Sequence, residues 1–155
     1  KEALDFTASE LLLEENYMPL MAAIGDGVTI VDLAAQIGYV GFREGKWNPD
    51  LMMMLMEPLM YLLMALAEKA GVTYRVDDED EDEEDDTLFE EKAKNIADTV
   101  KEKVDKGQIP SGALPSDIVA KIEALEMPQE SLLAQPEEPM VAEEQPQQSL
   151  LERGQ

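Results

Sequence analysis

Carboxylates are almost the only side chains in this sequence that could take part in chemistry. The chain of 155 residues has 35 Asp and Glu against 12 Lys and Arg, and it contains neither His nor Cys. Without His it lacks the commonest general base and metal ligand. Without Cys it lacks thiolate metal sites and disulfides. The sequence therefore predicts no catalytic residues, no metal site and no cofactor, and we expect a protein that is not an enzyme.

Glu57 is the one acid inside the apolar segment 51–67. In the segment 51–67, only Glu57 and Pro58 among seventeen residues are neither apolar nor aromatic, and six residues are Met. Acid–base chemistry needs a carboxyl group that is desolvated against an apolar wall. Glu57 could be buried and paired with a base, or it could lie on the outer, polar side of a helix, which we favour. The candidate bases are Arg43, Lys46 and Arg75.

The densest acidic segment is 77–86, DDEDEDEEDD, which is ten consecutive carboxylates. A calcium-binding loop spaces its ligands and needs a Gly for its turn, and this run has no Gly. Repulsion between like charges opposes compact structure, so the run reads as a linker or an acidic arm. The net charge of −23 also opposes direct nucleic-acid binding, which requires Lys and Arg, and it favours basic partners.

The Met-rich segment is predicted to form the central helix. Asn48 is a good N-cap, Pro49 suits the first helical position and Gly71 fits the left-handed position after the last turn. Pro58 predicts a kink. The seventeen residues 51–67 span about 25 Å as a helix, short of a hydrocarbon core of about 30 Å, so a membrane role is possible but not favoured.

The predicted fold is mainly α, in four segments. Residues 1–76 form a helical head, in which Thr7 and Thr29 cap helices, Pro19 breaks the first helix and Gly38 ends the second. Residues 72–76 alternate weakly and could form a short extended segment. Residues 77–86 are the acidic linker.

The remaining two segments follow the linker. Residues 87–126 form two amphipathic helices, over 88–106 after a Thr87 cap and over 117–126 after a Ser116 cap. Residues 127–155 form an extended tail rich in Pro, Glu and Gln.

Residues 39–47, YVGFREGKW, form a predicted connector that combines aromatic and basic side chains. Such residues are enriched in protein-contact hot spots, so the connector could be a contact loop. The alternative, which we favour, is that Phe42 and Trp47 plug the core at the end of the central helix.

The tail contains one short unit twice. Ser-Leu-Leu occurs at 131–133 and at 149–151, each time after a polar stretch. Two such boxes are typical of linear docking motifs in which a Leu pair enters a pocket on a partner. The predicted docking residues are Leu132, Leu133, Leu150 and Leu151.

The central helix has too few predicted neighbours to cover it on all sides. A helix that is apolar all round must be buried, and a large exposed apolar surface marks an interface. We therefore expect a homo-oligomer that self-associates through residues 49–70. The predicted contact residues are Trp47, Leu51, Met52, Leu55, Met56, Leu59 and Leu63.

The helical head, acidic arm and docking tail resemble the small accessory proteins of tailed-bacteriophage particles, of the internal, ejection, neck or scaffold type. Scaffolding proteins end in a basic segment, whereas this chain ends in QQSLLERGQ. The resemblance implies a structural or assembly subunit that binds other particle subunits, in the virion or the host cytoplasm. The sequence shows no secretory signal. Two alternatives stay open: an acidic decoy or regulator that binds a basic protein surface through 77–86, and a membrane-active ejection protein.

Overall fold

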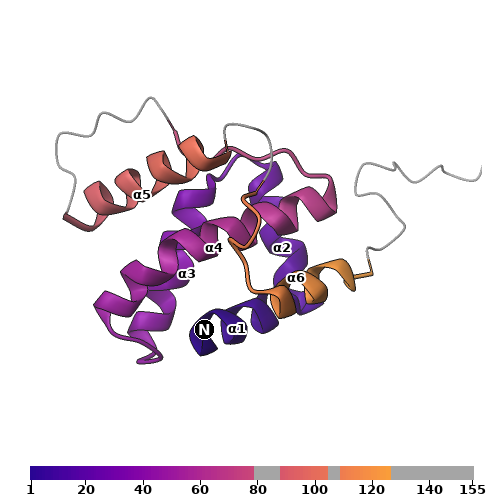
Figure 1. Cartoon of the computed structure of the whole chain (residues 1–155), viewed down its shortest axis with the longest axis horizontal. Coiled ribbons are helices and arrows are strands. Elements are labelled where there is room, and N and C mark those ends of the chain that lie inside the picture. The colour runs from indigo at the N-terminus through magenta and orange to yellow at the C-terminus, as the bar shows by residue number, and fades with distance from the viewer. Residues whose placement is uncertain (79–87, 105–108, 127–155) are drawn as a thin grey trace, which may run out of the picture.

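The structure is a computed structural model, and it describes residues 1–78, 88–104 and 109–126. These residues form six α-helices and no strand, which confirms the mainly α prediction. The helices are α1 (Glu2–Leu11), α2 (Glu14–Gly25), α3 (Ile30–Arg43), α4 (Pro49–Ala70), α5 (Leu88–Val104) and α6 (Ser116–Glu123). Figure 1 shows α4 crossing the molecule with the other helices around it.

The predicted limits of α4 are confirmed. The Asn48 side chain accepts a hydrogen bond of 2.8 Å from the Leu51 amide. Pro49 is the first helical residue, and Gly71 ends the helix in the left-handed conformation, with φ of 68°. Pro58 lies inside the helix, which is continuous on both sides of it.

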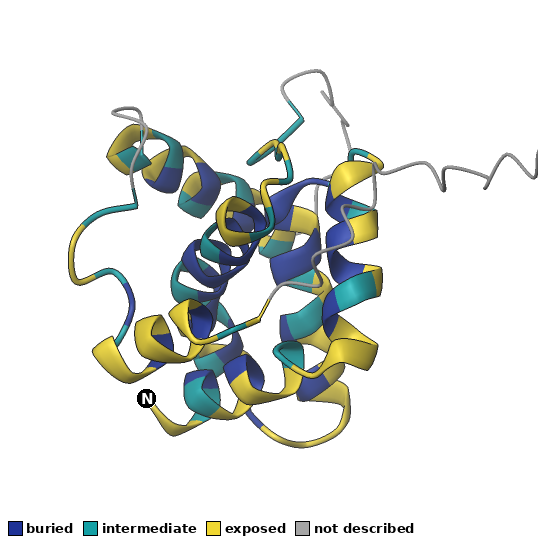
Figure 2. Ribbon diagram, turned by 90° about the vertical axis from the view of Figure 1, so that its right-hand side faces the viewer, coloured by how far each residue is buried: buried dark blue, intermediate teal, exposed yellow. Residues whose placement is uncertain are grey.

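Burial of α4 contradicts the expectation that it lacks neighbours. It packs against each of the other five helices, and the buried parts of the ribbon face inward (Figure 2). The predicted contact residues Met52, Leu55, Met56, Leu59 and Leu63 are each 0–5% exposed. Side chains this deeply buried cannot contact a second copy while the fold stays closed, so these residues form the core of the chain. Leu51 alone of the predicted α4 residues stays partly exposed.

By length and composition, α4 is also the single described helix that could cross a membrane. Most of its apolar window is buried inside the protein, and the core helix of a soluble protein passes the same test. The finding is therefore weak evidence for a membrane role.

The two C-terminal helices supply the missing cover. Ala97 and Val100 of α5 and Ile118 of α6 are fully buried, in the same core as α4. The described part of 87–126 therefore belongs to the same folded body as the N-terminal helices. Ser116 is the first residue of α6 and Pro115 precedes it, so the expected Ser116 cap is wrong. Thr87 lies outside the described residues.

The helix limits in the N-terminal part differ from the prediction. Thr7 lies inside α1, where its buried hydroxyl donates to the Ala3 carbonyl at 2.9 Å instead of capping a helix. The chain breaks at Leu13, whose backbone is extended, and Pro19 is accommodated within α2. Burial of Tyr17, Met21 and Ile24 holds α2 together across the proline, so packing outweighs the lost hydrogen bond.

Residues 72–78 form neither helix nor strand, and their backbone carbonyls cap the N-terminus of α3. The carbonyl groups of Arg75 and Val76 accept hydrogen bonds of 2.9 and 3.0 Å from the amides of Ile30 and Val31. Thr29 caps α3 as predicted, and its hydroxyl also donates to the Asp32 carboxylate at 2.7 Å. These contacts satisfy amides that a helix start otherwise leaves unpaired.

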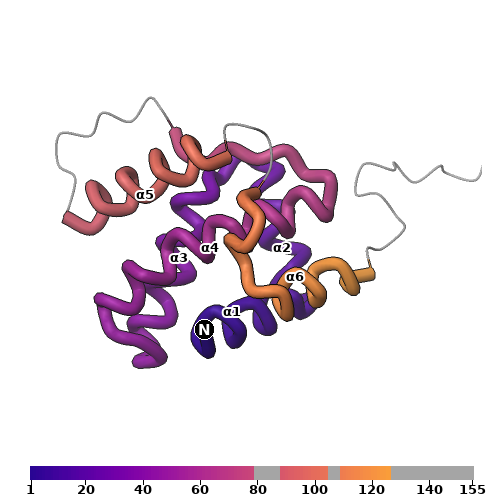
Figure 3. The backbone as a smooth tube through the Cα atoms, in the orientation of Figure 1, coloured from indigo at the N-terminus to yellow at the C-terminus, as the bar shows by residue number. Residues whose placement is uncertain are grey.

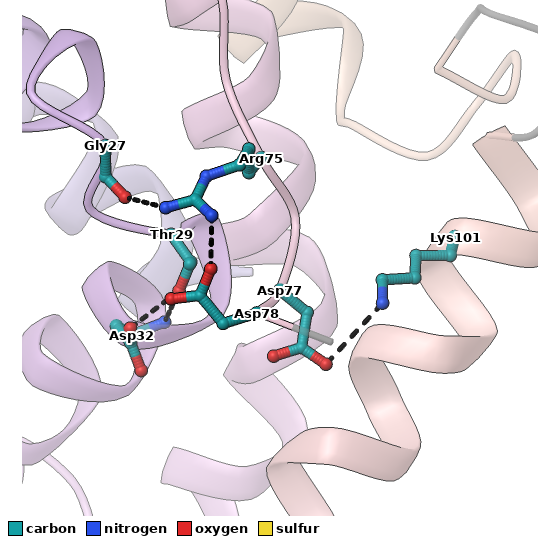
Figure 4. Close-up of polar contacts among 7 residues, drawn as sticks. All are labelled: Gly27, Thr29, Asp32, Arg75, Asp77, Asp78 and Lys101. Carbon is teal, nitrogen blue, oxygen red and sulfur yellow. Dashed lines mark hydrogen bonds and ion pairs between the residues drawn. The ribbon is translucent and has the colours of Figure 1, made fainter. Parts of the chain in front are cut away.

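Side chains tie the same segment to its surroundings (Figure 4). The Arg75 guanidinium donates to the Gly27 carbonyl at 2.9 Å and pairs with Asp78. Asp77 pairs with Lys101 of α5 at 3.6 Å. The first two acids of the run 77–86 therefore take part in the fold, and the other eight lie outside the described residues.

Candidate protein-contact site

The sequence segment expected to be a connector is largely helix. α3 continues through Gly38 and Gly41 to Arg43, so Gly38 does not end it, and its φ is not positive. Both glycines are buried in α3 because larger neighbours pack against them. A Cβ at Gly38 would lie 3.2 Å from Met52, and one at Gly41 would overlap the Trp47 ring. Close packing against Met52 and Trp47, and not a turn that needs positive φ, explains why residues 38 and 41 are glycines.

Trp47 fixes the turn between α3 and α4. It is 8% exposed, and its Nε1 donates a buried hydrogen bond of 2.8 Å to the Gly38 carbonyl. The plug interpretation is therefore right for Trp47. It is wrong for Phe42, which is 39% exposed.

The exposed side chains on the last turns of α3 form a surface that we call the α3 patch: Tyr39, Val40, Phe42 and Arg43. Tyr39 and Val40 are each 52% exposed. The Tyr39 and Phe42 ring centroids lie 6.4 Å apart, and the Arg43 guanidinium lies 5.9 Å from the Tyr39 centroid. Because a rigid helix carries these groups, the aromatic rings and the cation are held in place before any partner binds.

A second feature, the α1–α4 groove, includes Trp47 in its lining. It has a volume of about 760 Å³ and is lined by Lys1, Glu2, Ala3, Phe6, Lys46, Trp47 and Leu51. Phe6 is 44% exposed, and the Lys46 ammonium lies 4.5 Å from its ring centroid. Lys46 also pairs with Glu44 at 2.8 Å. The groove therefore combines an apolar wall with charges at its rim.

Glu57 is neither buried nor paired with the bases that we expected. Its carboxylate accepts hydrogen bonds from the Tyr61 hydroxyl at 3.2 Å and the Lys103 ammonium at 2.5 Å. Burial raises the pKa of Tyr61, and the negative charge of Glu57 raises it further. The hydrogen bond to Glu57 raises the pKa of Lys103. The three residues line a small cavity of about 310 Å³ beside the loop 110–113.

The Glu57 cluster joins α4 to α5. The Glu57 side chain is 38% exposed and its carboxylate pairs with Lys103, so it is not the desolvated acid that proton transfer requires. No group of three or more Asp or Glu side chains within the described chain is placed to hold a metal ion.

Comparison of the chain with protein-family models, curated proteins and solved structures finds no match.

The structure separates the predicted site residues into three groups. Trp47 and five of the six predicted α4 residues lie in the core, and Leu51 lines the α1–α4 groove. Leu132, Leu133, Leu150 and Leu151 lie outside the described residues.

Sequence reasoning missed Tyr39, Val40 and Arg43 as a surface on α3. A helix continued past Gly38 would have shown it, because Tyr39, Phe42 and Arg43 are spaced i, i+3, i+4 and share one face.

Proposed function

We propose that this protein is a non-enzymatic assembly subunit that associates with copies of itself through the α3 patch. The observation that carries the proposal is the exposure of Tyr39, Val40 and Phe42 beside Arg43 on one rigid helix. Aromatic residues and Arg are enriched where proteins contact one another, and they dominate the binding free energy. The α3 patch thereby replaces the core residues of α4 as the proposed contact.

The proposed partner is a second copy of the chain. Arg43 is a cation on a chain of net charge −23, so a complementary surface must offer both carboxylates and apolar area. Another copy, with 35 Asp and Glu residues, offers carboxylates and an α3 patch of its own. Since like-charged chains repel, apolar contact must supply the attraction, and added salt should strengthen the association.

Self-association fits the resemblance to accessory proteins of tailed-phage particles. A small helical subunit that binds its own copies and other particle subunits would act in the virion or in the host cytoplasm during assembly. The particle role is part of the proposal, and the α3 patch is its proposed contact surface.

One observation bears on the acidic-decoy alternative. Asp77 and Asp78, the first two acids of the run, pair with Lys101 and Arg75 respectively. A run of carboxylates that continues from these residues could bind a basic protein surface. That binding would weaken as salt rises, which is the opposite of the response expected of the α3 patch.

Sedimentation velocity over a range of protein concentrations, at low and high salt, tests the proposal. The expected result is a concentration-dependent oligomer that grows with salt. The double variant Tyr39→Ser, Phe42→Ser should remain monomeric under all these conditions. Both side chains are exposed, so circular dichroism should show an unchanged helical fold.

Met54→Ser is the matched control. Met54 is 75% exposed on α4, outside the α3 patch, so its loss should leave the oligomer intact. A wild-type chain that is monomeric throughout would overturn the proposal. So would an oligomer that survives the double variant.

A further inference from the structure

The outer face of α3 carries opposite charges at its two ends. Asp32 lies in the first turn of the helix and Arg43 is its last residue. At about 100° per residue, a spacing of i, i+4, i+7 and i+11 keeps side chains on one narrow stripe. The residues with this spacing are Asp32, Gln36, Tyr39 and Arg43, and all four are exposed. We call them the α3 stripe.

The α3 stripe extends the α3 patch toward the start of the helix. Val40 and Phe42 flank the stripe, one on each side, and both are exposed. In Figure 3, α3 runs alongside α4, and its C-terminal end lies at the lower left edge of the molecule. The stripe therefore combines an acidic end, a basic end and apolar side chains between and beside them.

The groups at the two ends of the stripe keep capacity for a partner. Within the described chain, Arg43 forms no ion pair, and its guanidinium lies 5.9 Å from the Tyr39 ring centroid. A guanidinium has five N–H donors in its plane, so a ring beside it leaves the group able to bind a carboxylate. The Asp32 carboxylate accepts one hydrogen bond, of 2.7 Å, from the Thr29 hydroxyl. Two carboxylate oxygens can accept about four.

We infer that two copies of the chain pair through antiparallel α3 helices, with Asp32 of each copy against Arg43 of the other. This inference rests on the proposed self-association through the α3 patch, and it adds the orientation and the second half of the contact. In a two-fold symmetric interface, if residue i contacts residue j, then j also contacts i. One alignment therefore forms both ion pairs and sets Gln36 against Tyr39 between them. A parallel pair would instead bring like charges together at both ends.

Apolar and charged side chains have separate roles in this pair. Tyr39, Val40 and Phe42 supply the attraction, while the two ion pairs fix orientation and register. An exposed ion pair contributes little to the binding free energy, so the association can still grow with salt. A single pair of helices falls below the buried area of stable complexes, about 1,200 Å², so the dimer should dissociate on dilution.

Charge reversal tests the pairing, by sedimentation velocity of the full chain at low salt. Asp32→Arg should raise the dissociation constant of the dimer roughly tenfold, because it sets Arg against Arg at both ends. Arg43→Asp should raise it as well, because it sets Asp against Asp. The chain that carries both substitutions has opposite charges at both ends again, and it should associate as the wild type does.

Glu10→Arg is the matched control for net charge. Glu10 is exposed on α1, outside the stripe, and its reversal changes the net charge by the same amount as Asp32→Arg. A smaller net charge weakens the repulsion between copies, so Glu10→Arg should strengthen the association, in the opposite direction to Asp32→Arg. Far-UV circular dichroism checks that each variant is folded, and recovery in the double variant shows that Asp32→Arg itself permits folding.

The outcomes separate the pairing from the proposed function. If Asp32→Arg strengthened the association as Glu10→Arg does, the antiparallel pair would be overturned while self-association through the α3 patch would stand. A folded double variant that failed to recover would have the same meaning. A wild-type chain that is monomeric at all concentrations would overturn both.

Discussion

The Trp47 indole lies directly against Gly41, and its ring nitrogen donates a 2.8 Å hydrogen bond to the carbonyl of Gly38. This one side chain fixes the angle between α3 and α4. It also lines the α1–α4 groove. Any change that moves Trp47 should therefore disturb the junction of α3 with α4 and the groove.

Gly41→Ala should destabilise the protein. A Cβ at this position would overlap the Trp47 ring, and overpacking of a core costs about 1–3 kcal/mol. Urea unfolding followed by far-UV circular dichroism gives the loss in free energy of unfolding. Gly38→Ala on the same helix is the control, because its Cβ would meet only the flexible Met52 side chain at 3.2 Å. Equal effects of the two substitutions would contradict the packing seen at Trp47.

Leu63→Ala should lower the free energy of unfolding by about 2–5 kcal/mol, because Leu63 is fully buried and a cavity would remain. Met54→Ala, on an exposed position of the same helix, should change it by about 0.5 kcal/mol or less. Urea unfolding at two protein concentrations separates a core role from an interface role. If the cost of Leu63→Ala depended on protein concentration, α4 would be a shared interface after all.

Thr29→Ala should cost about 0.5–2 kcal/mol, as expected for the loss of an N-cap side chain. Thr29 is 1% exposed, and its hydroxyl bonds both the amide and the carboxylate of Asp32. Thr99→Ala is a suitable control, since the exposed Thr99 hydroxyl bonds only the Asn95 carbonyl within α5. Thermal unfolding of the three proteins measures the difference. A loss no larger for Thr29 than for Thr99 would argue against the cap.

Tyr74→Phe should flatten the alkaline loss of stability. Burial and the hydrogen bond to Glu68 raise the pKa of Tyr74 to about 12, above its ordinary value of 10. A group whose pKa is higher in the folded state stabilises the fold below the unfolded pKa, and this contribution is lost as pH rises from 10 to 12. Urea unfolding at points across this range gives the slope. Burial also raises the pKa of Tyr17 and Tyr61, so part of the slope should remain.

Tyr39→Phe is the control for that experiment. Tyr39 is 52% exposed on α3, so this substitution leaves the hydrogen bond between Tyr74 and Glu68 intact. An alkaline slope that is the same in the wild type and in Tyr74→Phe would show that the hydrogen bond to Glu68 does not contribute.

Local signals in the sequence determined the helices wherever a cap or a periodic pattern acts over a few residues. Asn48, Pro49 and Gly71 set the ends of α4, Thr29 set the start of α3, and the stripe of Ala93 and Val100 set the inner face of α5. The mainly α fold follows from these signals, because a cap satisfies amides of its own helix and needs no distant partner.

Tertiary packing decided the rest. Gly38 carries a helix-ending signal in the sequence, yet both Gly38 and Gly41 lie within α3 because Met52 and Trp47 fill the space beside them. Pro19 remains helical because its neighbours are buried. The sequence could not show that α5 and α6 cover α4, since contacts between distant residues leave no periodic trace. The Met-rich helix is therefore the core of one chain, and the candidate contact surface lies on the outer face of its neighbour α3.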